Sequence, residues 1–147
     1  MSKHIHAPFH LAIPVRNISE SKDFYINTLG CKPGRSSEEW IDLDLFGHQL
    51  VCHLDPSLGP EGKVKLINNE VDAHGVPVPH FGVVLDMAQW QKLADTLTAA
   101  GTDFVIEPYV RFKGKAGEQA TLFFFDPSGN ALEFKAFKDL QQLFAVD

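Results

Sequence analysis

The chain has 147 residues, which suits one domain of ordinary size or two small modules that share a core. Hydrophobic residues make up 44% and charged residues 22% of it, which is typical of globular proteins. The formal net charge of −6 argues against a nucleic-acid or anionic-membrane surface, because such surfaces need clustered positive charge.

The location expected from the sequence is the cytoplasm. No run approaches the roughly 18 apolar residues that would cross a bilayer, and the N-terminus lacks the apolar segment of a secretion signal. Two cysteines do not make a disulfide framework, which favours a reducing compartment. The composition therefore predicts a protein that acts on a small molecule, with no nucleic acid or membrane as partner.

The first half of the chain predicts a strand, a helix and three more strands. Residues 9–15 alternate as a half-buried strand does, with His10 opposite the apolar side chains. Residues 17–30 have apolar residues at helical spacing, and Ser19 or Ser21 is the expected N-cap. The strand-like segments that follow are 31–37, 39–46 and 48–54.

The second half repeats this order. Residues 80–86 form a predicted strand with His80 opposite its apolar side, and residues 87–101 form a predicted helix. The segment 108–118 is rich in Gly, Lys and Arg, so we expect a loop there. His10 and His80 hold the same position in the two copies. The last three predicted strands are 102–108, 118–126 and 130–137.

The SKDFYINTLG helix, the DPSGNALEF turn and strand, and the two His-led strands resemble the vicinal oxygen chelate superfamily. That superfamily includes glyoxalases, bleomycin-resistance proteins and extradiol dioxygenases. The resemblance implies an α+β fold in which two tandem βαβββ modules curl into a cup of mixed sheet, with the helices outside. We expect a single domain, 1–147, made of module 1 (about 7–56), a connector (57–77) and module 2 (about 78–138).

Strand alternation places His10, His80 and Glu133 opposite the apolar faces of their strands, and so toward the cup. Two imidazoles and one carboxylate suit a divalent first-row metal and leave coordination positions open. In the superfamily, the metal ligands come from the first and last strands of each module, which correspond here to these three residues. The alternative is that both histidines bond to backbone and that Glu133 is solvated.

The fourth ligand position differs from the glyoxalase pattern. Gly-x-x-x-Glu at 129–133 has its counterpart in Gly-x-x-x-Val at 47–51, and the Val51 side chain cannot bind a metal. A shift of one residue would place Cys52 there as a thiolate ligand. Three ligands leave room for two substrate oxygens and O₂, as in non-haem Fe(II) oxygenases.

Four further residues are candidates for catalysis. His53 could act as general acid and base, or be a surface histidine, and Gln49 could hold a bound oxygen or orient His53. Tyr109 and Arg111, on the predicted loop, could approach an anionic substrate. The alternative for that loop is a solvated basic segment.

The sequence favours a metal-dependent enzyme that binds a small substrate through two adjacent oxygens. The resemblance and the ligand set indicate an extradiol-type ring-cleaving or related dioxygenase with Fe(II), and with O₂ as co-substrate. The alternatives are a non-oxidative glyoxalase-like lyase or isomerase with Mn, Ni or Zn, and a metal-free binding or resistance protein. We expect a homodimer, and the sequence leaves open whether one chain or two chains close the cup.

Overall fold

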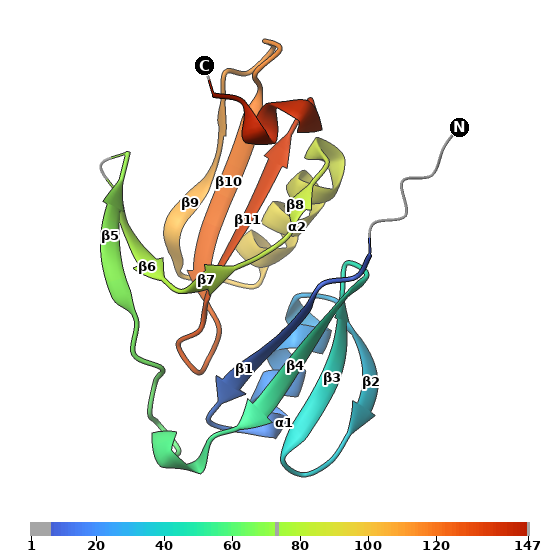
Figure 1. Ribbon diagram of the computed structural model, residues 1–147, viewed down its shortest axis with the longest axis vertical. Coiled ribbons are helices and arrows are strands. Elements are labelled where there is room, and N and C mark those ends of the chain that lie inside the picture. Colours follow the sequence, from blue (N-terminus) through green and yellow to red (C-terminus); the bar gives the residue numbers. More distant parts are fainter. Residues whose placement is uncertain (1–6, 73, 147) are drawn as a thin grey trace.

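The computed structural model describes residues 7–72 and 74–146, and Figure 1 shows its two halves one above the other. The lower half begins with a strand and a short helix that continues as a π-helix, and three strands follow. Its elements are β1 (His10–Val15), α1 (Ile18–Lys22), η1 (Asp23–Thr28), β2 (Lys32–Ser36), β3 (Trp40–Leu45) and β4 (His48–Leu54).

The upper half repeats this order after a connector that itself contains a hairpin, β5–β6, which the sequence pattern did not predict. The elements are η2 (Pro56–Leu58), β5 (Ile67–Val71), β6 (His74–Val78), β7 (His80–Phe81), β8 (Val84–Leu85), α2 (Met87–Ala99), β9 (Phe104–Arg111), β10 (Gln119–Phe125), β11 (Ala131–Phe137) and η3 (Leu140–Phe144).

Each half forms one sheet in which the last strand lies beside the first. The strand order is β1-β4-β3-β2 in the lower sheet and β7-β11-β10-β9 in the upper sheet, where β8 also pairs with β11. The first strands run parallel to the last ones, and the remaining pairs are antiparallel. The predicted α+β fold with two βαβββ modules is therefore confirmed; below, module 1 means β1–β4 and module 2 means β7–β11.

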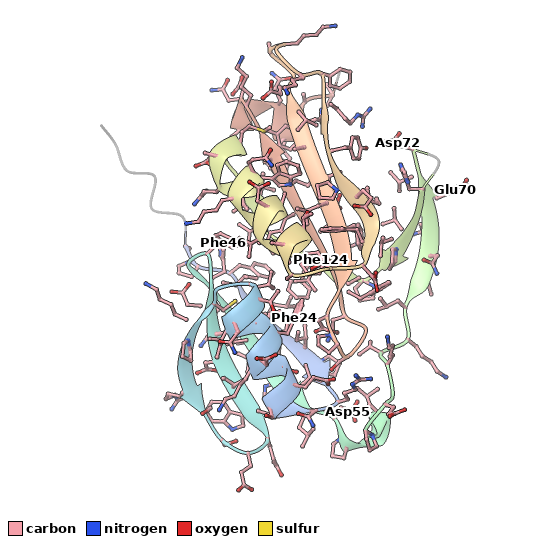
Figure 2. The ribbon with its side chains drawn as sticks, turned by 180° about the vertical axis from the view of Figure 1, so that it is seen from behind. Phe24, Phe46, Asp55, Glu70, Asp72 and Phe124 are labelled. Atoms are coloured by element: carbon pink, nitrogen blue, oxygen red, sulfur yellow. The ribbon has the colours of Figure 1, made fainter. Side chains whose placement is uncertain are left out.

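The helices cover the same side of both sheets, and Figure 2 shows them in front of the strands. Their apolar faces are buried as the helical spacing predicts, with Tyr25 and Leu29 in module 1 and Trp90, Leu93 and Leu97 in module 2. These side chains belong to one hydrophobic core that includes both modules. The opposite face of each sheet is therefore left for function.

Aromatic side chains join the modules, and Figure 2 shows Phe24, Phe46 and Phe124 gathered where the two halves meet. The ring centroids of Phe24 and Phe124 lie 5.9 Å apart, and Phe124 stacks on Phe134 at 6.1 Å. Phe46 meets the edge of Phe134 at 5.9 Å. Such pairs stabilise the module interface beyond the area that they bury.

A buried carboxylate adds a polar link between the modules. Asp126, in the turn before β11, accepts hydrogen bonds from the Tyr25 hydroxyl at 2.7 Å, from two backbone N–H groups and from the Asn130 side chain. Asn130 also donates to the Pro14 carbonyl on β1 at 2.8 Å. Burial raises the pKa of Asp126, and the carboxylate remains fully hydrogen-bonded, as a buried charge must be.

The expected N-cap of the first helix is wrong. Asn17 caps α1, because its side-chain oxygen accepts the backbone N–H of Glu20 at 2.8 Å. Ser19 lies inside the helix, and the hydroxyl of Ser21 donates back to the Asn17 carbonyl. Asparagine caps as well as serine does, so propensity alone did not separate these neighbours.

The predicted loop 108–118 is also partly wrong, because its first residues continue β9. Tyr109 pairs with Thr121 and Arg111 pairs with Gln119 across β9 and β10. The connection between these strands is therefore only the turn 112–118. Within the residues that the structure describes, no helix is long and apolar enough to cross a membrane.

Candidate metal centre

His80 and Glu133 meet on the open face of module 2. β7 and β11 run parallel with His80 beside Ala131, so Glu133 lies two residues further along the same face. His80 Nε2 and Glu133 Oε1 are 3.3 Å apart, and their side chains are 30% and 14% exposed. The ring edge of His80 also packs against Phe123 at a centroid distance of 4.9 Å.

The surrounding hydrogen bonds define which atoms of this pair are available. The Nδ1–H of His80 donates to the Pro77 carbonyl at 2.7 Å, since a carbonyl can only accept, so Nε2 carries the lone pair of the neutral ring. The Thr121 hydroxyl donates to Glu133 Oε2 at 2.6 Å and leaves Oε1 facing the imidazole. In the neutral ring, two electron-pair donors therefore face each other, whereas a doubly protonated ring would form an ion pair with Glu133.

This donor pair fits a divalent cation. Two ligand atoms bound about 2.1 Å from one ion at right angles lie about 3 Å apart, close to the spacing of Nε2 and Oε1. A backbone carbonyl on the second imidazole nitrogen of His80 and a hydroxyl on the second oxygen of Glu133 are the supports that metal ligands commonly have.

His10 occupies the matching position in module 1. β1 and β4 pair in parallel with His10 beside Gln49, so Gln49 corresponds to Ala131 and Val51 corresponds to Glu133. The Gln49 side-chain carbonyl accepts the Nδ1–H of His10 at 2.8 Å, which leaves Nε2 free as in module 2. Gln49 thus orients His10, rather than His53 as considered from the sequence.

The structure does not bring the three predicted ligands together within one chain. His10 is absent from the cavity around His80 and Glu133, and the described residues contain no group of three His, Cys, Asp or Glu side chains that could hold a metal. His53 lies two residues beyond Val51 on the exposed face of β4 and also outside that cavity.

Cys52 does not take the fourth ligand position. Its side chain is fully buried in the core on the helix side of the sheet, away from the face that carries His10. Burial raises the pKa of its thiol far above the ordinary value, and raises the pKa of Cys31 to about 12. Neither side chain offers a thiolate near neutral pH.

A cavity of about 270 Å³ adjoins His80 and Glu133. Two of the predicted catalytic residues, Tyr109 and Arg111, line it from β9, because alternation turns both to this face. Lys135, on β11, lines it as well. Other lining residues come from the β5–β6 hairpin, including Asp72, His74 and Val76.

Two residues that support the centre were missed by the sequence interpretation. Thr121 could have been found, because it lies two residues from both Gln119 and Phe123 and so shares their face of β10, where it pairs with Lys135. Gly82 could not, because its role is steric: a Cβ there would lie 1.6 Å from the carbonyl oxygen of Glu133. This close approach of backbone needs glycine, and it also divides the predicted strand 80–86 into β7 and β8.

The duplicated modules, with a histidine at the same position of each first strand, define a paired-βαβββ protein with a cup-type site. The chain belongs to the Glyoxalase/Bleomycin resistance protein/Dioxygenase superfamily, whose sequence model matches residues 7–134. Members of this superfamily commonly bind a divalent metal. None of the curated proteins matches the chain significantly.

Solved structures agree with this assignment. A glyoxalase/bleomycin resistance protein/dioxygenase from Alicyclobacillus acidocaldarius is 36% identical, with 95% of this chain and 97% of that chain covered and a TM-score of 0.71. The fosfomycin resistance protein FosX from Listeria monocytogenes is 15% identical over 90% of this chain and 93% of its own, with a TM-score of 0.61.

Lactoylglutathione lyase from Agrobacterium tumefaciens is 16% identical over 92% of this chain and 97% of its own, with a TM-score of 0.59. At these low identities, the similarity to FosX and to the lyase shows the fold alone.

Proposed function

We propose that the protein is a metal-dependent enzyme whose metal is held by His80 and Glu133 of one chain and by His10 of a second copy. The 3.3 Å approach of His80 Nε2 to Glu133 Oε1, with both side chains oriented by further hydrogen bonds, is the observation that carries the proposal. With the imidazole neutral, a cation between these two acceptors would hold them at this distance; with the imidazole protonated, the two would form an ion pair, so metal content decides between them.

The sheet edges support a shared site in a homodimer. β1 and β7 are edge strands, and each carries a histidine of the triad. Odd-numbered residues of β1 bond to β4, as Gln49 N–H to Phe9 O shows, so the backbone of His10 faces the open edge. An unpaired edge is a template for a strand of another chain. Pairing β1 of one copy with β7 of the other would bring His10 to the His80–Glu133 pair.

The bound ion would supply a positive charge that holds two adjacent substrate oxygens and makes their deprotonation easier. The chain's own residues do the rest. Thr121 and Gln49 orient the ligands, and His53 of the second copy moves the substrate proton. Tyr109 and Arg111 line the cavity where the substrate would lie.

The ligand set favours a dioxygenase of the extradiol type, with Fe(II) and O₂. Val51 corresponds in register to Glu133, so the last strand of module 1 provides no carboxylate ligand. Two histidines and one carboxylate leave room for both a chelating substrate and O₂. Mn, Ni or Zn in this site would instead support a non-oxidative lyase or isomerase. Two buried free cysteines support the cytoplasm as its location.

The test is metal content after anaerobic purification, together with O₂ uptake on catechols. We expect about one iron per site, lost in His10→Ala and in Glu133→Ala. The two variants should then be mixed, unfolded and refolded together. Because a mixed dimer keeps one intact site, about a quarter of the sites should regain metal.

The outcomes separate the alternatives. Recovery in the mixture supports the shared site, whereas metal in His10→Ala alone shows that module 1 is not a source of ligands. A non-redox metal and no O₂ uptake would favour the lyase or isomerase. No metal in the wild-type protein, even after reconstitution, would overturn the enzyme proposal and leave a binding protein.

A further inference from the structure

Two cations, Lys135 and Arg111, lie on one side of the cavity beside His80 and Glu133. On the open face of module 2, the row next to Glu133 and Phe123 contains Lys135 and Thr121, and the following row contains Arg111. The two cations thus lie on one side of the His80–Glu133 pair, in a chain whose net charge is −6. The cavity lining also contains two carboxylates, Asp72 and Glu133, so the availability of the cations depends on which of these charges are paired.

Among the described residues, Glu133 forms no ion pair with Lys135 or with Arg111. The oxygens of Glu133 face Thr121 and His80, and no ion pair of Lys135 occurs within the described residues. Arg111 forms an ion pair of 3.5 Å with Asp72, whose side chain is 70% exposed, and its guanidinium lies 5.2 Å from the centroid of the Phe112 ring. Exposed contacts of this length contribute little, so both cations remain available to a ligand.

Asp72 holds the position that a ligand's carboxylate would take. It lies at the tip of the β5–β6 hairpin and reaches Arg111 from the opposite wall of the same cavity. The guanidinium accepts a carboxylate through two parallel hydrogen bonds, a geometry that the single long contact with Asp72 does not achieve. A substrate carboxylate can therefore displace Asp72 from Arg111.

The cavity size limits the ligand. About 270 Å³ lies just below the usual range of small-molecule pockets, which suits a single ring with short substituents. Phe137 and Tyr109 supply apolar and aromatic walls. Lys135 and Arg111 lie beside the His80–Glu133 pair. A carboxylate that they bind would therefore belong to the same small molecule as the two oxygens that bind the proposed metal.

We infer that the substrate is a small carboxylate whose anionic group is held between Lys135 and Arg111, with Asp72 as its internal competitor. This inference rests on the proposed function for the position of the two adjacent oxygens. It adds a substrate class, a further binding residue in Lys135, and a role for the connector hairpin.

The test uses two probes that differ only in the carboxylate, catechol and 3,4-dihydroxybenzoate. Dissociation constants are measured by calorimetry on the metal-loaded dimer and by NMR titration on metal-free protein. The wild type should bind the carboxylate probe at least about tenfold more tightly than catechol, as expected for a charge-assisted contact. Lys135→Met and Arg111→Met should reduce this ratio toward one, and Lys138→Met is the matched control outside the cavity.

Asp72→Asn gives a readout of opposite sign. It should tighten binding of 3,4-dihydroxybenzoate and leave that of catechol unchanged, which a merely structural effect would not do. A ratio near one in the wild type, or a ratio unaffected by both cation variants, overturns the inference. Loss of metal with a preserved ratio would refute the proposed metal chemistry and still support the anion site, so the two failures are distinguishable.

Discussion

Modules 1 and 2 share one topology, and yet only module 2 contains a nearly complete site. Both place a histidine on the edge strand and fix its Nδ1–H with a hydrogen bond. In module 2, Glu133 faces the imidazole and a hairpin encloses the cavity, whereas in module 1 the corresponding residue is Val51 and the face is open. The comparison shows that the two modules share a histidine at the same position, while the residues around it differ.

The two histidines also differ in what holds them. His80 is fixed by the backbone carbonyl of Pro77, and His10 is fixed by the side chain of Gln49. A backbone support cannot be removed by substitution, and a side-chain support can. The modules therefore predict different responses to mutation, which the following experiments use.

The largest effect is expected for His80→Ala. It removes a ligand from the pair, so metal affinity should fall more than about 100-fold, beyond the loss typical of a supporting residue. Elemental mass spectrometry of the purified protein checks this. His53→Ala is the matched control, since it should lower turnover and keep the metal. Full metal content in His80→Ala would show that the assignment is wrong.

The next effect is expected for Gln49→Leu. Without the amide, the ring of His10 loses its fixed orientation, and metal affinity should fall about 10- to 100-fold. Competition with a chelator measures the affinity, and Gln91→Leu on the outer helix is the control. An unchanged affinity would mean that His10 is not a ligand or does not need this support.

Gly82→Ala tests how closely the backbone at position 82 packs against that of Glu133 on β11. Module 1 has Ala12 at this position, two residues after its histidine, but in module 2 the added Cβ would meet the Glu133 carbonyl at 1.6 Å. We expect a loss of at least about 1–3 kcal/mol in the free energy of unfolding, because the backbone must move. Denaturant titration measures the loss. Gly117→Ala, where a Cβ meets nothing within 4 Å, should stay near wild type.

The smallest effect is expected for Tyr25→Phe, which changes the link between the modules. Asp126 would lose one of its donors, at a cost of about 1–2 kcal/mol. Burial and the nearby Asp126 charge raise the pKa of Tyr25 well above 10. The folded state therefore holds this proton more tightly than the unfolded chain, so the contribution of Tyr25 to stability should be constant below about pH 10 and be lost above it. The buried thiols of Cys31 and Cys52, whose pKa values are also raised, should add a separate loss that begins near pH 9.

Unfolding curves at several alkaline pH values measure this dependence. Tyr25→Phe should remove the part of the loss that begins above pH 10 and keep the part from Cys31 and Cys52, whereas Tyr109→Phe, on the cavity side, should keep both parts. An equal alkaline loss in wild type and Tyr25→Phe would contradict the assignment of the effect to the buried phenol.

The sequence by itself determined the repeated order of elements, the helix faces and the strand faces of the three candidate ligands. Period-two alternation sorted His10, His80 and Glu133 away from the core, because a strand residue can face only one of two sides. The same reasoning identified Val51 as the counterpart of Glu133, which the strand register bears out. These features depend on the spacing of neighbouring residues, which can be taken directly from the sequence.

Only the tertiary structure decided which of these side chains meet. The bond of Asp126 to Tyr25 spans 101 residues, and the contact of Arg111 with Asp72 spans 39. Such contacts depend on how the strands pair, which local sequence does not specify. For the same reason, the hairpin in the connector, the extension of β9 and the need for glycine at position 82 had no local signal. His10 and the His80–Glu133 pair lie on two separate sheets, and His10 does not line the cavity of the pair, so alternation along each strand could not tell whether they meet within the chain.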